Sequence, residues 1–217
     1  EQTERIAQIG SWEWDLRTGA GICSKGFFEI HGMEDPGAMN LSLLWPLAYP
    51  ADMPMIDQAY ARAMAGTQPW DVEHRIIRQC DGVARHVRSW GEIERDEQGN
   101  PIRMVGVTQD ITERKQNERA KLQLAAIVES TDAAIIGTDA DSTVTSWNRG
   151  AEKLYGYSEV EAVGRTIESL IAYDTPGSIT PIVQQIREGM VTLNLQARRQ
   201  TKEGRVVDVV VTISPIL

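Results

Sequence analysis

Apolar and polar residues alternate along several short stretches in the first half of the chain, and such alternation predicts β-strands with one buried face. Gly, Asp and Asn separate these stretches, and they favour hairpin connections. The predicted strands cover residues 11–16, 20–24, 70–79, 83–94 and 102–109. The first half of the chain therefore contains five predicted strands.

Two segments between these strands have helical spacing instead. The first covers residues 25–30 and ends at Gly32, because glycine readily adopts the left-handed conformation that closes a helix. The second covers residues 51–65, and its apolar stripe consists of Met55, Ala59, Ala63 and Met64. The first half thus has the order two strands, two helices, three strands.

The second half repeats this order. The residues around Gly32 resemble those around Gly156, and the residues before Gly82 resemble those before Gly204. In the second copy, the same patterns predict strands at 134–138, 144–147, 191–200 and 206–213 and helices near 151–154 and 182–190. Leu217 falls where the first copy turns into its last strand, so we expect the second sheet to lack that strand in this chain. The strand then either lies beyond residue 217 or comes from another chain.

The copies are separated by a charged segment that contains neither Gly nor Pro, whereas a flexible tether would be rich in Gly and Ser. Asp110 or Thr112 is suited to cap a helix here. The sequence therefore predicts an α+β fold in which domains at 1–110 and 131–217 are joined by a helical linker at 111–130. Either this linker pairs with its twin in a second subunit, or it is a solvated helix without a partner.

Composition narrows the classes of function. The formal net charge of −9 argues against a nucleic-acid-binding face. Two cysteines are too few for a disulfide framework or a metal cage, and they favour a reducing, cytoplasmic location. No apolar run approaches the ~20 residues that cross a bilayer, so we expect no membrane contact by this segment. Whether the parent protein is anchored in a membrane stays open.

The order of elements resembles that of tandem PAS sensor domains over nearly the whole chain. The stretches that carry this resemblance in the first copy are 12–15, 73–75, 81–82 and 106–112, and those in the second are 127–130, 147–151 and 155–158. The resemblance implies a five-stranded antiparallel sheet in each domain, with helices over one face that enclose a pocket. It also implies a position upstream of a histidine kinase, as in a two-component system, or of a diguanylate cyclase.

The resemblance allows the known PAS cofactors to be tested residue by residue. Light-oxygen-voltage domains form a flavin adduct with a cysteine, and Ile167 stands at that position in the second copy. Such domains also carry a glutamine on the last strand, where the first copy has Thr108. A flavin held without a covalent adduct stays open. Haem is disfavoured, because neither residues 51–65 nor 182–190 contain a histidine that could serve as axial ligand.

Enzyme chemistry finds little support in the sequence. No glycine-rich phosphate loop follows a predicted strand, and no Ser or Cys lies in a nucleophile motif. The three histidines, His31, His74 and His86, do not have the spacing of a metal site. We therefore expect no catalytic residue and no metal ligand in this segment, although the parent protein is expected to carry an output enzyme.

Ligand contact is assigned to six residues of the first copy, because binding pockets are mostly apolar with a few placed polar groups. These candidates are Trp14, Phe28, Trp45, His74, Trp90 and Thr108. The alternative is that these side chains simply fill the core, as aromatic residues do in many domains. The second copy has fewer aromatic residues, and there Asn148 is predicted to cap the following helix.

Signal relay is assigned to the start of the linker, at Asp110, Thr112, Arg114 and Lys115. By the resemblance, Asp110 pairs with Arg114 or Lys115 and holds the helix at a fixed angle to the sheet.

Two functions follow as hypotheses. The first is a sensor that binds a small ligand or cofactor in the first domain and signals through the linker to a downstream output domain. The second is a ligand-free scaffold that forms a homodimer through the linker and the N-terminal helices.

Overall fold

The computed structural model describes residues 7–171 and 193–214. The chain forms two compact units, residues 1–119 and 120–217, and the boundary between them falls inside one helix. The predicted domain limits at residues 110 and 130 stay a proposal. The predicted helix at 182–190 lies outside the described residues, and so do the first two residues of the strand predicted at 191–200.

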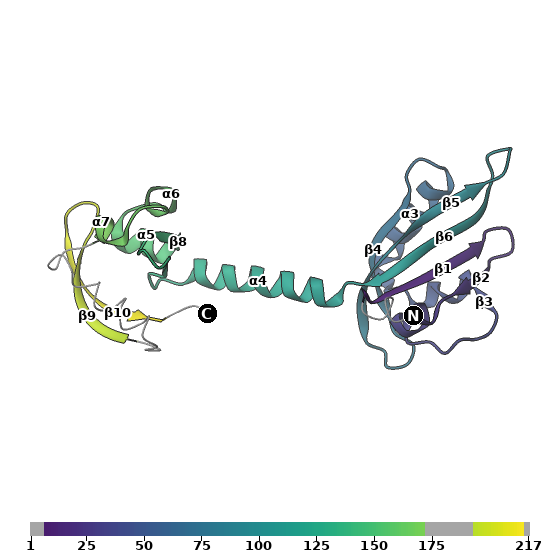
Figure 1. Ribbon diagram of the computed structural model, residues 1–217, viewed down its shortest axis with the longest axis horizontal. Helices are drawn as coiled ribbons and strands as arrows, with labels where there is room; N and C mark the ends of the chain where they lie inside the picture. The colour runs from purple at the N-terminus through teal and green to yellow at the C-terminus, as the bar shows by residue number, and fades with distance from the viewer. Residues whose placement is uncertain (1–6, 172–192, 215–217) are drawn as a thin grey trace. The chain divides into compact units, whose positions relative to one another are not determined.

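The first unit is built on one antiparallel sheet with the strand order β3-β2-β1-β6-β5-β4 (Figure 1). Its strands are β1 (Ile9–Asp15), β2 (Ala20–Cys23), β3 (Met39–Asn40), β4 (Trp70–Ile77), β5 (Ala84–Arg95) and β6 (Pro101–Asp110). The five predicted strands are thus confirmed. The structure adds the two-residue strand β3, which pairs with β2 at the edge of the sheet.

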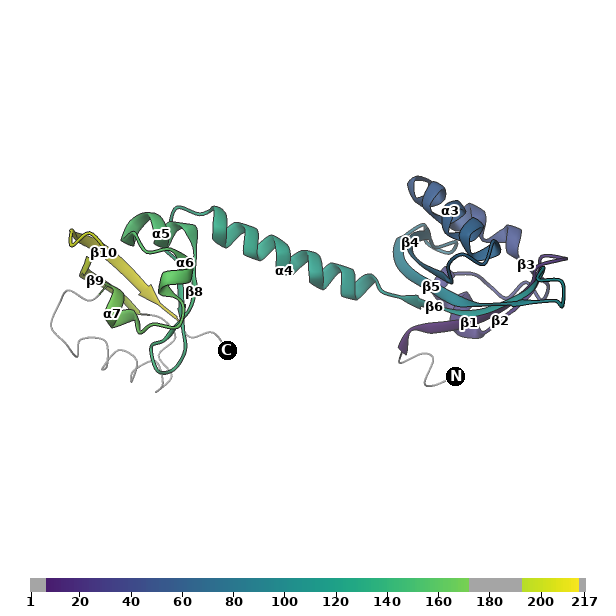
Figure 2. The ribbon, with the colours of Figure 1, turned by 90° about the horizontal axis from the view of Figure 1, so that it is seen from above.

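Helical segments cover one face of this sheet, and Figure 2 shows α3 lying over it. They are α2 (Lys25–His31), the 3-10 turns η1 (Leu41–Leu43), η2 (Trp45–Leu47) and η3 (Pro50–Asp52), and α3 (Met53–Met64). Gly32 ends α2 in the left-handed conformation with φ 62°, as predicted.

The buried stripe of α3 differs from the predicted one. The residues that face the sheet are Ile56, Ala59 and Ala63, whereas Met55 is 42 % exposed. The prediction for Met55 was wrong because Ile56 lies nearer to the centre of the face formed by Ala59 and Ala63, which leaves Met55 at the edge of that face.

The second unit has two pairs of antiparallel strands, β7 with β8 and β9 with β10. Its elements are β7 (Ile136–Thr138), β8 (Val144–Trp147), α5 (Arg149–Tyr155), α6 (Glu159–Ala162), α7 (Ile167–Ile171), β9 (Leu193–Gln200) and β10 (Val206–Ile213). Trp147, Ala151 and Tyr155 lie at the centre of a tightly packed core. Within the described part of this unit β10 is the last strand, as predicted.

One uninterrupted helix, α4 (Thr112–Ser130), begins directly after β6 and confirms the predicted helical linker. Asn148 fastens its far end, since its Nδ2 donates to the carbonyl oxygens of Val128 (2.8 Å) and Ala133 (3.0 Å). The same side chain accepts from the backbone N–H of Ala151 and so caps α5, as the sequence predicted. In the described parts of the chain, we find no helix whose length and apolar character would allow it to cross a membrane.

Candidate functional site

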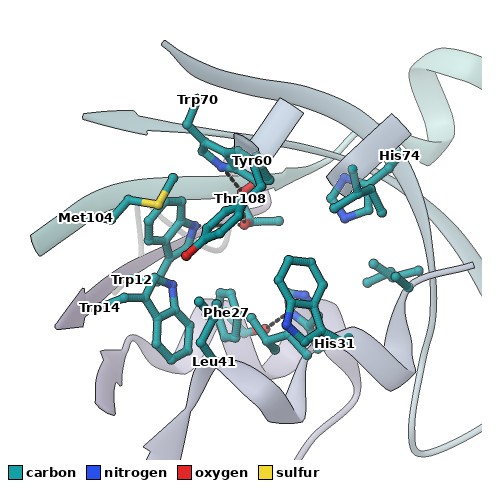
Figure 3. Close-up of a pocket in the computed structure, with 16 residues that line it drawn as sticks. Trp12, Trp14, Phe27, His31, Leu41, Tyr60, Trp70, His74, Met104 and Thr108 are labelled. Carbon is teal, nitrogen blue, oxygen red and sulfur yellow. Dashed lines mark hydrogen bonds between the residues drawn. The ribbon is translucent and has the colours of Figure 1, made fainter. Parts of the chain in front are cut away.

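A cavity of about 70 Å³ lies between the sheet of the first unit and its covering helices (Figure 3). Six aromatic side chains form part of its wall: Trp12, Trp14, Phe27, Trp45, Tyr60 and Trp70. Tyr60 stands edge-on to two of them, with ring centroids 5.9 Å from Trp45 and 6.3 Å from Trp70. Edge-to-face pairs of this kind fix the orientation of the rings. The wall is therefore apolar and well ordered.

Two glycines in the sheet create the space for Trp12. Trp12 on β1 is directly opposite Gly106 on β6, which is in turn opposite Gly91 on β5. A Cβ atom on Gly106 would lie 2.5 Å from Cζ2 of Trp12, and one on Gly91 would lie 3.0 Å from its Cη2. Because glycine has no side chain, the indole can lie flat across both strands. This position brings its Nε1 to the polar groups of the cavity.

A short chain of hydrogen bonds runs along the sheet side of the cavity. Trp12 Nε1 donates to Thr108 Oγ1 at 3.0 Å, and Trp70 Nε1 donates to Ser89 Oγ at 3.1 Å. The two hydroxyl groups are joined by a hydrogen bond of 3.2 Å from Thr108 to Ser89. Both hydroxyl-bearing residues are buried. These groups are therefore positioned by the sheet and shielded from solvent.

His31 comes to the cavity from α2, on the side away from Thr108 and Trp70 (Figure 3). Its Nδ1 lies 2.9 Å from the carbonyl oxygen of Phe27, and its ring stacks on Phe27 at a centroid distance of 4.1 Å. A carbonyl oxygen can only accept, so Nδ1 carries the proton and Nε2 of the neutral ring is an acceptor. Burial lowers the pKa of His31 to about 4, an effect that nearby His74 increases, so the ring is neutral at pH 7.

His74 on β4 also lines the cavity. Burial lowers its pKa too, while the carboxylate of Asp52 opposes that change. Its Nδ1 is buried without a hydrogen-bond partner in the described structure. A buried polar atom without a partner is unusual in a folded protein.

Four of the six residues predicted to contact a ligand line this cavity: Trp14, Trp45, His74 and Thr108. Phe28 and Trp90 do not. Phe28 is buried next to Phe27, and it is Phe27 that faces the cavity. Trp90 follows Ser89 on β5 and, since side chains alternate along a strand, it points to the other face, where Arg88 lies 5.0 Å above its ring.

The sequence prediction missed Trp12, Phe27, His31, Trp70 and Ser89 as lining residues. A signal for Trp12 was available, because glycines inside two predicted strands indicate a close approach by a large neighbour. Strand alternation also joins Trp70 to His74, which lie an even number of residues apart on β4. Ser89 carried no comparable signal, since a serine on a strand is common on either face.

The start of α4 is fastened to β5 by backbone and hydroxyl contacts. Thr112 Oγ1 accepts from the backbone N–H of His86 at 3.0 Å, and the backbone N–H of Ile111 donates to the carbonyl oxygen of His86 at 2.8 Å. Thr112 and Ile111 are both buried. Thr112 thus lies at the junction between sheet and helix, where the sequence placed it.

The ion pairs at this junction differ from the prediction. Asp110 accepts from the backbone N–H of Thr112 at 2.8 Å and lies 3.5 Å from Arg85. Arg114 and Lys115 instead contact Glu73 on β4, at 2.6 Å and 2.7 Å. The predicted pairing of Asp110 with either base was therefore wrong. Arg85 lies on the neighbouring strand beside Asp110, whereas Arg114 and Lys115 lie one turn further along α4, within reach of β4.

The described residues, 7–171 and 193–214, contain no group of three or more His, Cys, Asp or Glu side chains that could hold a metal ion. The pKa of Glu73 is lowered, chiefly by its hydrogen bond to Lys115, as expected for a carboxylate between two bases. Glu73 and His74 are adjacent on β4, so the ion pairs of Arg114 and Lys115 and the cavity use opposite faces of that strand.

Comparison with known proteins agrees with this architecture. Residues 22–108 and residues 122–217 each match a family described as a PAS fold. The chain consists of two PAS domains. A solved structure of a sensory box histidine kinase/response regulator from Burkholderia thailandensis is 29 % identical, with a TM-score of 0.50, and the match covers 58 % of this chain and 92 % of that one.

The relatives of these PAS domains are signalling proteins. The protein named "Probable diguanylate cyclase DgcE" from Escherichia coli is 26 % identical over 182 residues, which is 82 % of this chain and 16 % of that protein. Sensor protein FixL from Bradyrhizobium diazoefficiens is 26 % identical over 167 residues, which is 75 % of this chain and 33 % of that protein. The chain thus spans at most a third of the length of these two relatives.

Proposed function

We propose that the first PAS domain is the sensory part of a signalling protein, which binds a small ligand in its cavity and passes the bound state to α4. The observation that supports this best is that the same three strands line the cavity and hold the start of α4. His74 on β4, Ser89 on β5 and Thr108 on β6 line the cavity. The same strands hold the start of α4 through Glu73, through His86 and by direct continuation at Asp110.

The relay set comprises Asp110, Thr112, Arg114 and Lys115, with Glu73 as the partner of the two bases. Glu73 and His74 are neighbours on β4, so a shift of the strand at the cavity also moves the carboxylate that holds α4. A ligand can bias two arrangements of the helix only by the difference in its affinity for them. A tenfold difference corresponds to about 1.4 kcal/mol, which is comparable to the strength of such exposed ion pairs.

The size of the cavity supports a small ligand over a flavin. Pockets for drug-sized molecules usually measure about 300–1,000 Å³, and this one measures about 70 Å³. A three-ring cofactor would enter only after several aromatic side chains had moved. We place the output domain downstream in the same chain, in a histidine kinase or a diguanylate cyclase, because one relative is named a probable diguanylate cyclase and a similar solved structure is that of a sensory box histidine kinase/response regulator.

The second proposed function, a dimerisation scaffold, is supported by α4. Leu124 and Ile127 are 64 % and 55 % exposed, although they are large apolar residues. Together with Val128 they share one face of the helix, at spacings of three and four residues. A second copy of α4 would cover this face. The two functions are compatible, because a sensor that acts through a paired helix needs both.

Nuclear magnetic resonance on the full chain tests the sensory function. Neutral compounds of four or five non-hydrogen atoms (pyrazole, pyrrole, isoxazole, acetamide and urea) are added while the indole N–H signals of Trp12 and Trp70 are followed. Hydrogen exchange at the amides of residues 111–115 is measured in the same samples. We expect at least one compound to shift both indole signals and to change the exchange rates about twofold or more.

The variant Ala48→Phe provides the control, since Ala48 lines the cavity and is buried. Its larger side chain should fill the cavity and abolish both responses. Should no compound shift the indole signals of the parent chain, ligand binding would be refuted. Should a compound bind without any change in exchange at residues 111–115, the relay would be refuted while binding would stand.

A further inference from the structure

In the chain of hydrogen bonds on the sheet side of the cavity, one donor and one acceptor have no partner. Two indole N–H groups and two hydroxyl groups bring four protons to Thr108 Oγ1 and Ser89 Oγ, which together offer four lone pairs. Three hydrogen bonds use three protons and three lone pairs. Whichever way the hydroxyl groups rotate, one hydroxyl proton and one lone pair remain available inside the cavity.

The helix side of the cavity presents an acceptor. The hydrogen bond between Nδ1 of His31 and the carbonyl oxygen of Phe27 fixes the tautomer, so Nε2 can accept but cannot donate in the neutral ring. No described residue forms a hydrogen bond with Nε2. Because His31 lines the cavity, the lone pair of Nε2 is the group that His31 offers to an N–H or O–H donor of a ligand.

The wall of the cavity excludes charged ligands. Its lining contains no Asp, Glu, Lys or Arg side chain, and its two histidines are buried among aromatic rings. A charged group without a partner would lose its hydration in such surroundings and gain little in return. An ammonium, guanidinium or carboxylate group is therefore disfavoured, whereas a neutral polar molecule can use the groups that are left over.

The volume of the cavity limits the size of the ligand. About 70 Å³ is less than half of a cavity that accepts benzene, about 150 Å³. Four or five non-hydrogen atoms are thus the upper limit for the cavity as it stands. The limit on binding energy per atom then restricts such a ligand to about micromolar affinity.

We infer that the cavity takes a compact, neutral ligand of about five non-hydrogen atoms that donates one hydrogen bond to Nε2 of His31 and accepts one from the hydroxyl pair of Thr108 and Ser89. This inference rests on the proposed function, because it specifies the ligand of the same site. Planar five-membered rings that carry both an N–H group and an acceptor nitrogen, and small primary amides, belong to this class.

Three azoles of nearly equal size test the inference in the full chain. Pyrazole has a donor and an acceptor, pyrrole has only the donor, and isoxazole has only acceptors. Dissociation constants come from titrations that follow the indole N–H signals of Trp12 and Trp70. One net hydrogen bond is worth roughly two- to tenfold in affinity. We expect pyrazole to bind at least threefold tighter than either of the other two, and acetate and guanidinium not to bind.

The variant His31→Phe removes the acceptor on the helix side while it keeps a flat ring beside Phe27. In this variant the preference for pyrazole over isoxazole should fall to within about twofold, since the donor of pyrazole has lost its partner. His86→Phe is the matched control, because His86 lies on β5 outside the cavity lining. It should retain the full preference. Comparing azoles within one variant removes any effect of altered folding.

Equal affinities for the three azoles, or tighter binding of acetate or guanidinium, would overturn the inferred ligand class while leaving the sensory function intact. An unchanged preference in His31→Phe would overturn the role of Nε2. Binding of acetate or guanidinium, together with binding of none of the neutral compounds, would overturn the class alone. A lack of binding by every compound tested would overturn both the class and the proposed function.

Discussion

His31 shows how position changes the chemistry of a residue. It is buried, its ring stacks on Phe27, and burial lowers its pKa to about 4, whereas a histidine in the unfolded chain has a pKa of about 6.5. Below pH 6.5 the unfolded chain therefore binds a proton that the folded unit rejects. Stability from this residue is fully present above pH 6.5 and is lost as the pH falls towards 4.

We predict that the first unit loses roughly 2 kcal/mol of unfolding free energy through His31 between pH 7 and pH 5. Urea unfolding followed by tryptophan fluorescence measures this loss, since five of the six tryptophans, all except Trp147, lie in residues 1–119. In His31→Phe the decrease should be smaller by about that amount. Parallel pH profiles of the variant and the parent would contradict the prediction.

Among the elements, α4 is held at its start by exposed ion pairs and at its end by a buried amide. Glu73 contacts Arg114 and Lys115 at the start, and all three side chains are at least a third exposed. Exposed pairs contribute about 0.2–1 kcal/mol each, so they orient the helix more than they stabilise the fold. Asn148 is 2 % exposed, and its side chain forms four hydrogen bonds to backbone groups. These buried hydrogen bonds contribute more to the stability of the fold than the exposed ion pairs do.

Glu73→Gln should increase hydrogen exchange at the first amides of α4 about two- to fivefold, because the two ion pairs no longer restrain the first turn. The unfolding free energy of the first unit should fall by less than about 1 kcal/mol. Hydrogen exchange with mass spectrometry measures the first effect, and high salt should weaken it. Glu92→Gln, an exposed position on β5, is the control. Unaltered exchange in Glu73→Gln would show that Glu73 does not restrain the start of α4.

Asn148→Ala should destabilise the second unit by about 2–4 kcal/mol, since it leaves several buried backbone groups without partners. Asn148→Ser should cost less, because a serine can still accept from Ala151 and cap α5. Exchange of the amides of residues 131–171 in increasing urea measures both variants. A loss below 1 kcal/mol in Asn148→Ala would show that water or nearby groups replace the amide.

For the whole molecule, we predict a homodimer that pairs through the apolar face of α4 formed by Leu124, Ile127 and Val128. The double variant Leu124→Glu with Ile127→Glu should be a monomer, because four carboxylates would face one another in the dimer. Ala126→Glu places a carboxylate on the opposite, exposed face of the same helix and should leave the dimer intact. Light scattering after size-exclusion chromatography measures the mass. A monomeric parent chain would refute this prediction.

The strands, the helix α4 and the duplication were determined by the sequence alone. Strand alternation has a period of two, hairpins need Gly, Asp or Asn, and a segment without Gly or Pro continues as a helix, so these features depend on neighbours in the chain. The capping role of Asn148 was predicted for the same reason. Local rules suffice wherever the partners of a residue lie within a few positions.

Tertiary structure decided the contents of the cavity and the partner of the linker. Trp90 is more apolar than Ser89, but the register of β5 turns Ser89 inward and Trp90 outward. Glu73 meets Arg114 and Lys115 only because β4 lies next to β5 and α4 leaves the sheet beside them. Residues about forty positions apart meet through the pairing of whole strands, and no local pattern in the chain encodes which face or which partner results.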